Sequence, residues 1–242
     1  MAIVLFTDFG TDDLYVGQVT AALAERAPRV PVLDALHDAP AFGIEPSAHL
    51  LAALAAAYPR GSVFLAVVDP GVGGPRGAIV VAADGRFFAG PDNGLLSVIW
   101  QRARQRRCWR ILWQPKRLTS SFHGRDLFAP VAAALALRRV PRGWLEPKSV
   151  PDILLDARDL ARVIYVDHYG NCVTGIRAAK VARTARVHAG GRTLGWSRTF
   201  HQARRGVAFW YANSMGLVEI AANRASAART LRLRVGSRVR FA

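Results

Sequence analysis

The sequence has 242 residues, 51% of them hydrophobic, which allows one large domain or two unequal ones and excludes a disordered chain. Its formal net charge of +16 comes almost wholly from arginine, because Lys116, Lys148 and Lys180 are the only lysines. The charge has two interpretations: an anionic partner such as nucleic acid or a membrane surface, or a compositional bias spread over solvated faces. The basic residues form no single block, which favours the second. The densest run, 102–110, is expected at a helix end and is a candidate contact patch.

The two cysteines, Cys108 and Cys172, lie far apart in the sequence. They form neither a metal knuckle nor a disulfide framework, so we expect a reducing, cytoplasmic environment. The first residues predict a strand rather than a signal peptide. The Ala-rich run 50–58 is too short to span a bilayer, so we expect a soluble protein with no membrane partner.

Strands alternate with helices over the first 140 or so residues. Apolar runs predict strands at 3–6, 30–36, 63–68, 78–83, 86–89 and 110–113, and helical spacing predicts helices at 15–25, 47–58, 95–104 and 127–138. Asp84-Gly85 is a hairpin turn between two of these strands. The alternation predicts a largely parallel α/β sheet.

The pattern changes after three prolines, Pro141, Pro147 and Pro151, which punctuate a predicted linker. Short strands with almost no helix between them are then expected at 162–166, 173–176, 185–188, 192–194, 208–211, 217–221 and 231–235. This pattern is typical of a small antiparallel barrel or sandwich. We therefore predict an N-terminal α/β domain over 1–150, a linker to about 160, and a C-terminal β-barrel domain over 151–242.

Carboxylates follow the first predicted strand, where Thr7-Asp8-Phe9-Gly10 leads to Asp12 and Asp13. The loop lacks the Gly-x-Gly-x-x-Gly pattern that holds a pyrophosphate in a Rossmann fold. Asp8 at a strand end is suited instead to binding hydroxyls, such as a ribose diol, or a cation. Asp12 is also a candidate helix N-cap.

The third predicted strand ends at Asp69, and the Gly-rich loop that follows carries Arg76. These two side chains are expected to face each other at the sheet edge where α/β proteins bind ligands. His123 lies in a comparable loop before a helix, so all three can converge there and orient and polarise a water. A lone loop histidine is more often a simple hydrogen-bonding residue. A metal site is the other alternative, but no ligand pair has helical or knuckle spacing.

Two turns of the C-terminal part carry polar groups, Asp167 to Asn171 and Asn213 to Gly216. Taken singly they predict an Asx-type turn and a hairpin turn. In combination, an aromatic and an amide can hold a purine while Asp167 binds an ammonium group.

Six motifs in order resemble a known family. They are Thr7-Asp8-Phe9-Gly10 with Tyr15-Val16-Gly17, Val68-Asp69-Pro70-Gly71-Val72-Gly73, Pro91-Asp92-Asn93-Gly94, Phe122-His123-Gly124-Arg125-Asp126, Asp167 to Asn171, and Asn213-Ser214 with Glu219-Ile220-Ala221. Over nearly the whole chain the sequence resembles the S-adenosyl-L-methionine (SAM) hydroxide adenosyltransferases, which are SAM hydrolases related to SAM-dependent chlorinases and fluorinases. The resemblance implies an N-terminal α/β domain, a C-terminal β-barrel, and a homotrimer whose SAM sites form between neighbouring subunits. The implied reaction is attack of water or hydroxide on C5′ of SAM to give adenosine and L-methionine, with no cofactor and no metal.

Site residues carried over from the resemblance fall into groups. Asp69, Arg76 and His123 match the water-handling triad, Asp8 the ribose-diol ligand, and Asp12 and Asp13 the loop near the methionine portion. Phe42, Tyr169 and Phe200 match aromatic residues that line the nucleoside site. Asn171 matches a residue that contacts adenine. Asp167 matches a residue that contacts the amino group, and Ser214 one that contacts the methionine carboxylate. The segment passing the adenine contains Glu219, Asn223 and Arg224. Met215 stands where fluorinase-type sequences carry an arginine, and Gly175 replaces a usual asparagine.

Hydrolysis is favoured over halogenation by Asp69, whose fixed negative charge would repel a halide. The halogenases carry tyrosine at the positions of Asp69 and His123. Two alternatives stay open: a SAM-dependent halogenase with room for chloride beside Gly124, and a basic protein that binds a nucleoside or nucleic acid without turnover. Nucleic acid is not the expected partner of the leading interpretation.

Overall fold

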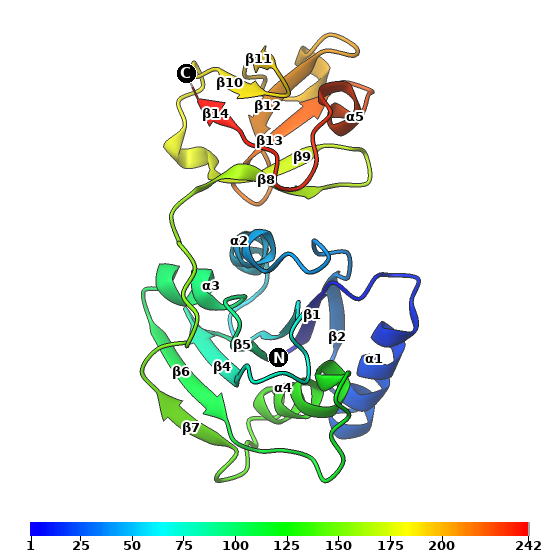
Figure 1. The fold of residues 1–242 in the computed structure, drawn as a ribbon, viewed down its shortest axis with the longest axis vertical. Helices are drawn as coiled ribbons and strands as arrows, with labels where there is room; N and C mark the ends of the chain where they lie inside the picture. Colours follow the sequence, from blue (N-terminus) through cyan, green and yellow to red (C-terminus); the bar gives the residue numbers. More distant parts are fainter. Residues whose placement is uncertain (242) are drawn as a thin grey trace. The chain divides into compact units, whose positions relative to one another are not determined.

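The computed structural model describes residues 1–241, and the chain divides into two compact units (Figure 1). The first unit comprises Met1–Leu51 and Tyr58–Asp156, and the second comprises Ala52–Ala57 and the chain from Ala157 onward. Each unit has its own hydrophobic core.

The first unit is built on a seven-stranded sheet of order β2-β1-β3-β5-β4-β6-β7. The strands are β1 (Ile3–Thr7), β2 (Val32–Leu36), β3 (Val63–Val67), β4 (Ala78–Ala83), β5 (Arg86–Pro91), β6 (Arg106–Ile111) and β7 (Leu145–Lys148). The pairs β2–β1, β1–β3 and β3–β5 are parallel, whereas β4 pairs antiparallel with β5 and β6, and β7 with β6. Five of the seven strands therefore run in one direction, which confirms the mainly parallel α/β sheet.

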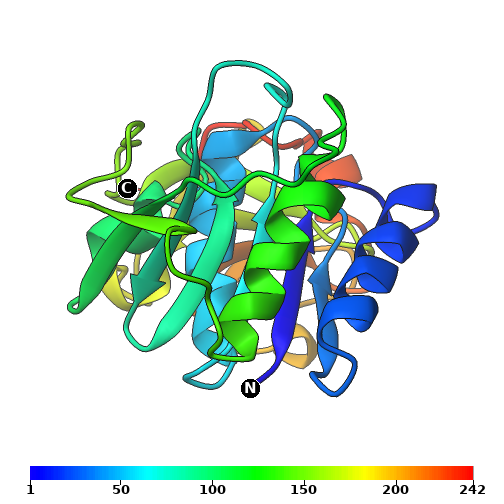
Figure 2. The same ribbon diagram turned by 90° about the horizontal axis from the view of Figure 1, so that it is seen from below.

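Helices cover both faces of this sheet (Figure 2). Helices α1 (Leu14–Arg26) and α4 (Ala129–Ala136) lie on one face, and α2 (Ile44–Leu54) and α3 (Ser97–Arg102) lie on the other. Successive strand residues point to opposite faces, so Ile3 and Leu5 pack toward α1 and α4. Burial of both faces explains why the central strands are apolar throughout.

Three predictions in this unit differ from the structure. The run 102–110 was expected at a helix end, but only its first residue, Arg102, belongs to α3, and from Arg106 it forms β6. The strand expected at 110–113 is displaced for the same reason: β6 starts at Arg106 and ends at Ile111, and its exposed first residues, Arg106 and Arg107, hid its start. Strand β7 was missed within the expected linker because it is short, lies at the sheet edge and contains Pro147, a residue that such edges tolerate.

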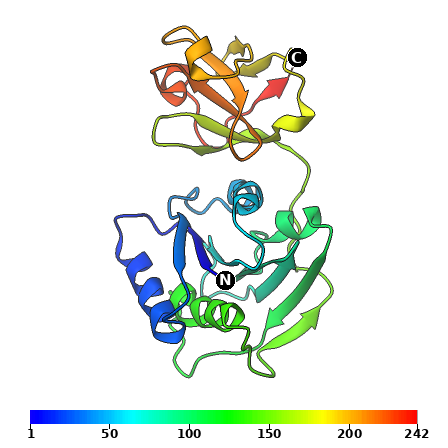
Figure 3. The same cartoon turned by 180° about the vertical axis from the view of Figure 1, so that it is seen from behind.

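The second unit contains two antiparallel sheets (Figure 3). One has the order β12-β13-β9-β8 and the other the order β11-β10-β14. The strands are β8 (Leu160–Val166), β9 (Cys172–Arg177), β10 (Val187–Ala189), β11 (Arg192–Leu194), β12 (Ala208–Ala212), β13 (Leu217–Ala222) and β14 (Arg240–Phe241). Within residues 1–241 they do not close into a barrel, because β10, β11 and β14 are too short and only isolated bridges link the two sheets. The antiparallel architecture is confirmed, and the closed barrel is not.

The strand expected at 231–235 is also wrong. Helix α5 (Ala227–Leu231) occupies its start, capped by the Ser226 hydroxyl, which accepts from the Arg229 N–H. Arg232 then ends the helix in a left-handed conformation, with φ of 53°.

The structure explains why glycine stands at position 175 in place of the usual asparagine. A Cβ at Gly175 would lie 2.6 Å from the Leu160 Cβ, where β8 and β9 approach closely.

Candidate active site

The loop after β3 brings Asp69 and Arg76 together. The Arg76 Nε lies 3.1 and 3.0 Å from the two Asp69 carboxylate oxygens, and Nη2 forms an ion pair with Oδ2. The side chains are only 4% exposed for Asp69 and 12% for Arg76. Such a two-point contact fixes the orientation of both groups, as the sequence predicted.

His123 completes the cluster from a different element. It directly precedes a π-helical turn, Gly124–Phe128, that leads into α4. The Arg76 Nη2 donates to the His123 Nδ1 at 2.9 Å. Because Nδ1 accepts this hydrogen bond, the neutral ring carries its proton on Nε2. Burial and the neighbouring Arg76 charge lower the pKa of His123, which favours this neutral form.

A cavity of about 380 Å³ lies beside this cluster in the first unit. Predicted residues that line it are Asp8, Asp13, Phe42, Asp69 and His123. The Asp8 Oδ2 accepts from the Phe42 N–H at 3.1 Å. Burial raises the pKa of Asp8, with a smaller contribution from the Asp69 charge. The carboxylates that follow β1 and β3, Asp8 and Asp69, therefore line the same cavity.

Aromatic side chains that sequence reasoning gave no role form one wall of this cavity. Phe9, Tyr15 and Phe122 pack against one another with ring centroids 5.3 to 5.9 Å apart. The sequence could have identified these three residues, because each lies within one of the six motifs that resemble the SAM hydroxide adenosyltransferases. Gly124 lines the same wall, and a Cβ there would lie 2.9 Å from the Phe9 Cζ. The ring of Phe9 therefore fills the space beside Gly124.

The second unit has its own cavity of about 680 Å³. Predicted residues that line it are Asp167, Tyr169, Asn171, Phe200, Asn223 and Arg224. The Asp167 carboxylate accepts from the backbone and side-chain amides of Asn171, both at 2.8 Å. Tyr169 is 75% exposed, so its ring is free to stack on a planar ligand. The Asx-type turn expected here is present, and it orients Asn171 at the cavity.

Tyr211 also lines this cavity, although sequence reasoning did not select it. Its hydroxyl donates to Glu219, directly opposite on β13, and Asn213 Nδ2 donates to the other Glu219 oxygen at 2.9 Å. Burial raises the pKa of Glu219, and burial together with this hydrogen bond raises the pKa of Tyr211. The cross-strand pairing of Tyr211 with Glu219 would have indicated that Tyr211 belongs to this site, but the sequence does not show the register of β12 and β13.

Some predicted residues lie elsewhere. Asp12 is exposed outside the first cavity, and Asp13, not Asp12, caps α1 by accepting from the Leu14 N–H at 2.6 Å. Ser214 is exposed in the β12–β13 turn and lines neither cavity. Glu219 is buried behind Tyr211.

Within residues 1–241, no group of three or more His, Cys, Asp or Glu side chains is arranged to hold a metal ion. None of the helices in the same residues has the length and apolar character needed to cross a membrane.

The chain is similar to known proteins over nearly its whole length. Residues 3–142 match the SAM hydroxide adenosyltransferase N-terminal domain, and residues 161–240 match the corresponding C-terminal domain. A (R)-S-adenosyl-L-methionine hydrolase of Thermus thermophilus is 40% identical, with 97% of each chain covered, and one of Salinispora arenicola is 34% identical over 97% of this chain and 95% of its own. A fluorinase of Nocardia brasiliensis is 24% identical over 97% of this chain and 94% of its own. A crystal structure of an uncharacterized conserved protein from Thermotoga maritima is similar with a TM-score of 0.89, at 28% identity over 99% of both chains.

Proposed function

The chain belongs to the SAM hydroxide adenosyltransferase family, and we propose that it hydrolyses SAM to adenosine and L-methionine. In this reaction the oxygen of water or hydroxide forms a bond to C5′ as the C5′–S bond breaks. The bond's electron pair passes to sulfur, which changes from a sulfonium to the neutral thioether of methionine. A proton is released when water is the nucleophile. The observation that carries the proposal is the buried Asp69–Arg76–His123 cluster beside a cavity.

The sulfonium is already a good leaving group, so the enzyme's task is to hold the nucleophile in line with C5′ and sulfur. The protonated Nε2 of His123 donates to the nucleophilic oxygen and stabilises its hydroxide-like form. Arg76 fixes the His123 tautomer through Nδ1, and Asp69 fixes Arg76. No step in this scheme uses a cofactor or a metal.

The remaining residues divide the substrate between the two cavities. In the first, Asp8 accepts hydrogen bonds from the ribose diol and Asp13 lies near the methionine portion, while Asp12 approaches that portion from the exposed loop outside the cavity. In the second, Tyr169 and Phe200 stack on the nucleoside while Asn171 and Asn223 contact adenine, with Glu219 behind them. Asp167 binds the methionine amino group, and Ser214 binds its carboxylate from the exposed β12–β13 turn outside the cavity. Phe42 packs on the nucleoside from the first cavity. The grouping of most of these residues in two cavities supports these roles.

We also propose a homotrimer, in which the first-unit cavity of one subunit and the second-unit cavity of its neighbour together bind one SAM. The cytoplasm is the proposed location, which agrees with the two buried, unpaired cysteines. Sedimentation velocity tests the assembly, since a trimer of a 26.3 kDa chain is readily separated from a monomer or dimer.

A halogenase is the alternative within the same chemistry. The geometry disfavours it for two reasons. The Asp69 carboxylate would repel a halide, and the space beside Gly124 is filled by the Phe9 ring. The named fluorinase is also more distant from this chain than the named hydrolases.

Product analysis separates these activities. Purified protein is incubated with SAM in chloride-containing buffer, and the nucleoside products are resolved by chromatography. Adenosine with equimolar methionine is the expected result. Formation of 5′-chloro-5′-deoxyadenosine would instead assign a halogenase, and unchanged SAM would point to a binding protein without turnover.

A further inference from the structure

The positive charge of this chain is concentrated in the second unit. Residues 157–242 contain fifteen arginines and one lysine but only three acidic residues, so they carry thirteen of the sixteen net positive charges. Residues 1–156 contain seventeen basic and fourteen acidic residues and are nearly balanced. A compositional bias of the whole chain would affect both parts alike. The asymmetry therefore needs an explanation specific to the second unit.

The three carboxylates of residues 157–242 are engaged away from most of these arginines. Asp159 pairs with Arg177 and Lys180, Asp167 accepts from Asn171, and Glu219 is buried against Tyr211. No further acidic residue exists in this segment to neutralise the other arginines.

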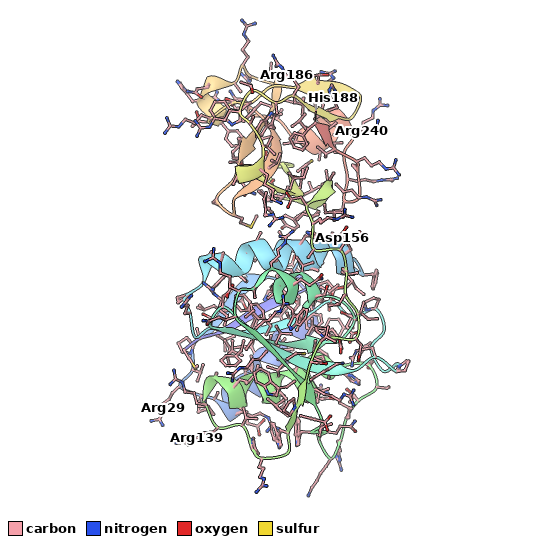
Figure 4. The ribbon with its side chains drawn as sticks, turned by 90° about the vertical axis from the view of Figure 1, so that its left-hand side faces the viewer. Arg29, Arg139, Asp156, Arg186, His188 and Arg240 are labelled. Carbon is pink, nitrogen blue, oxygen red and sulfur yellow. The ribbon has the colours of Figure 1, made fainter. Side chains whose placement is uncertain are left out.

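Five basic side chains share one face around the β11-β10-β14 sheet, and we name them the basic face: Arg162, Arg186, His188, Arg238 and Arg240. Arg240 lies opposite His188 in the β10–β14 register, and Arg238 lies opposite Arg162 across an antiparallel bridge. Arg186 directly precedes β10, and Arg238 lies two residues before Arg240 at the start of β14. The alternation of the strands, continued to these two residues, places them on the same face as His188 and Arg240. All five are exposed, and Figure 4 shows Arg186, His188 and Arg240 together at one end of the second unit.

This face is electrostatically unfavourable by itself. Like charges directly opposite each other on paired strands are destabilising, as for Arg162 and Arg238. Within residues 1–241 none of its four arginines forms an ion pair, and none of the five side chains lines the second-unit cavity. The arrangement is thus neither compensated internally nor used by the proposed hydrolysis. A bound polyanion would offset its self-repulsion.

We propose that the basic face binds the phosphate backbone of nucleic acid without sequence preference, a function separate from SAM hydrolysis. Guanidinium groups match phosphate oxygens in a two-point geometry that lysine cannot reproduce, which agrees with the use of arginine here. Cross-strand and alternate positions space the charges at about 5 to 7 Å, a separation suited to successive phosphates of an extended strand. This proposal revises the expectation that nucleic acid is not a partner.

A membrane surface fits this face less well. Binding to a bilayer interface combines basic residues with exposed apolar groups that insert among the lipids. Here two of the residues that alternate with the arginines are buried, since Val187 is 0% and Val239 2% exposed. The third, Phe241, is 37% exposed, but its ring packs against Trp210 with centroids 6.4 Å apart. The basic face therefore has one partly exposed ring and no continuous apolar surface to insert among lipids.

Fluorescence anisotropy with a labelled 20-nucleotide single-stranded RNA tests the proposal. The full-length wild-type chain is expected to bind with a Kd of about 1–100 µM at physiological salt. The variant Arg238→Ser/Arg240→Ser should weaken binding at least tenfold. It should also reduce the slope of log K against log salt by about 1.4, the contribution of two phosphate contacts to a single strand. Arg162→Ser/Arg186→Ser, which changes the same face from other segments, should act alike.

The matched control is Arg29→Ser/Arg139→Ser, which removes the same charge from exposed positions of the first unit (Figure 4). It should change RNA affinity less than twofold, and all three variants should retain SAM turnover. Equal weakening by the control would overturn the proposal in favour of diffuse charge attraction. Binding of phosphatidylserine vesicles with the same arginine dependence, but not of RNA, would overturn it in favour of a membrane surface.

Discussion

The Arg76 Nη2 lies 2.9 Å from the His123 Nδ1, although the two residues are 47 positions apart in the sequence. The same guanidinium holds both oxygens of Asp69. Arg76 thereby determines that the neutral imidazole carries its proton on Nε2. With Nδ1 occupied and Nε2 protonated, the neutral ring has no free nitrogen to accept a proton, which agrees with the proposed role of His123 as a hydrogen-bond donor.

Replacing His123 with alanine should lower kcat by about 100- to 1,000-fold, the usual effect of removing one donor to a developing anionic oxygen. KM for SAM should change little, because the interaction forms mainly in the transition state. His123→Gln, whose amide can donate from near the Nε2 position, should recover part of the loss. Steady-state kinetics checks this, with circular dichroism as the folding control; a His123→Ala enzyme of wild-type kcat would contradict the proposed role.

Activity should fall on the acid side with a midpoint below 6.5, the ordinary pKa of histidine, because burial and Arg76 lower the pKa of His123. Protonation places a hydrogen on Nδ1, directly against the Arg76 donor.

The folding stability of the protein should also decrease as the pH falls, in the same direction as the activity. The unfolded chain binds this proton more readily, so the contribution of neutral His123 is present above pH 6.5 and is lost as pH falls through the folded-state pKa. A pH profile of kcat measures the midpoint, and one above 6.5 would contradict the assignment.

Sequence reasoning found the Asp69–Arg76–His123 cluster because strand ends of an α/β sheet meet at one edge, and the apolar strands themselves are easily read. It did not find Tyr211, whose partner Glu219 is eight residues away and becomes its neighbour only through strand register. The cap of α1 was assigned to Asp12 instead of Asp13, since adjacent carboxylates are equivalent in a sequence pattern. The barrel was predicted from strand number, whereas closure depends on pairing between strands of two or three residues.

Arg76→Ala should reduce the free energy of unfolding by about 3–5 kcal/mol, because it leaves the buried Asp69 carboxylate without its partner. The double variant Arg76→Ala/Asp69→Asn should recover part of that stability while remaining inactive. Urea unfolding of both variants makes the comparison. If the single variant is as stable as the wild type, the ion pair contributes nothing to the fold.

Asp8→Asn should raise KM for SAM at least tenfold with a smaller change in kcat, because an amide offers one acceptor oxygen in place of two to the ribose diol. The Phe42 N–H already occupies the Asp8 Oδ2 at 3.1 Å. Comparison with 2′-deoxy-SAM sharpens the test, since the variant should discriminate less than the wild type against the substrate that lacks this hydroxyl. Undiminished discrimination would place the diol elsewhere.

Dialysis against EDTA should leave kcat unchanged, because the proposed reaction relies on the charges of Asp69, Arg76 and His123 and on the sulfonium leaving group. Metal content measured by plasma emission before and after dialysis is the control. Activity that disappears with the metal and returns on adding one divalent cation would refute the metal-free scheme.

Hydrolysis of SAM in water enriched in oxygen-18 tests the central claim most directly, because it reports which bond the nucleophile forms. Mass spectrometry of the products should find one oxygen-18 in the 5′-hydroxyl of adenosine and none in methionine. Adenosine without the label, or a product that retains the C5′–S bond, would contradict attack of water at C5′.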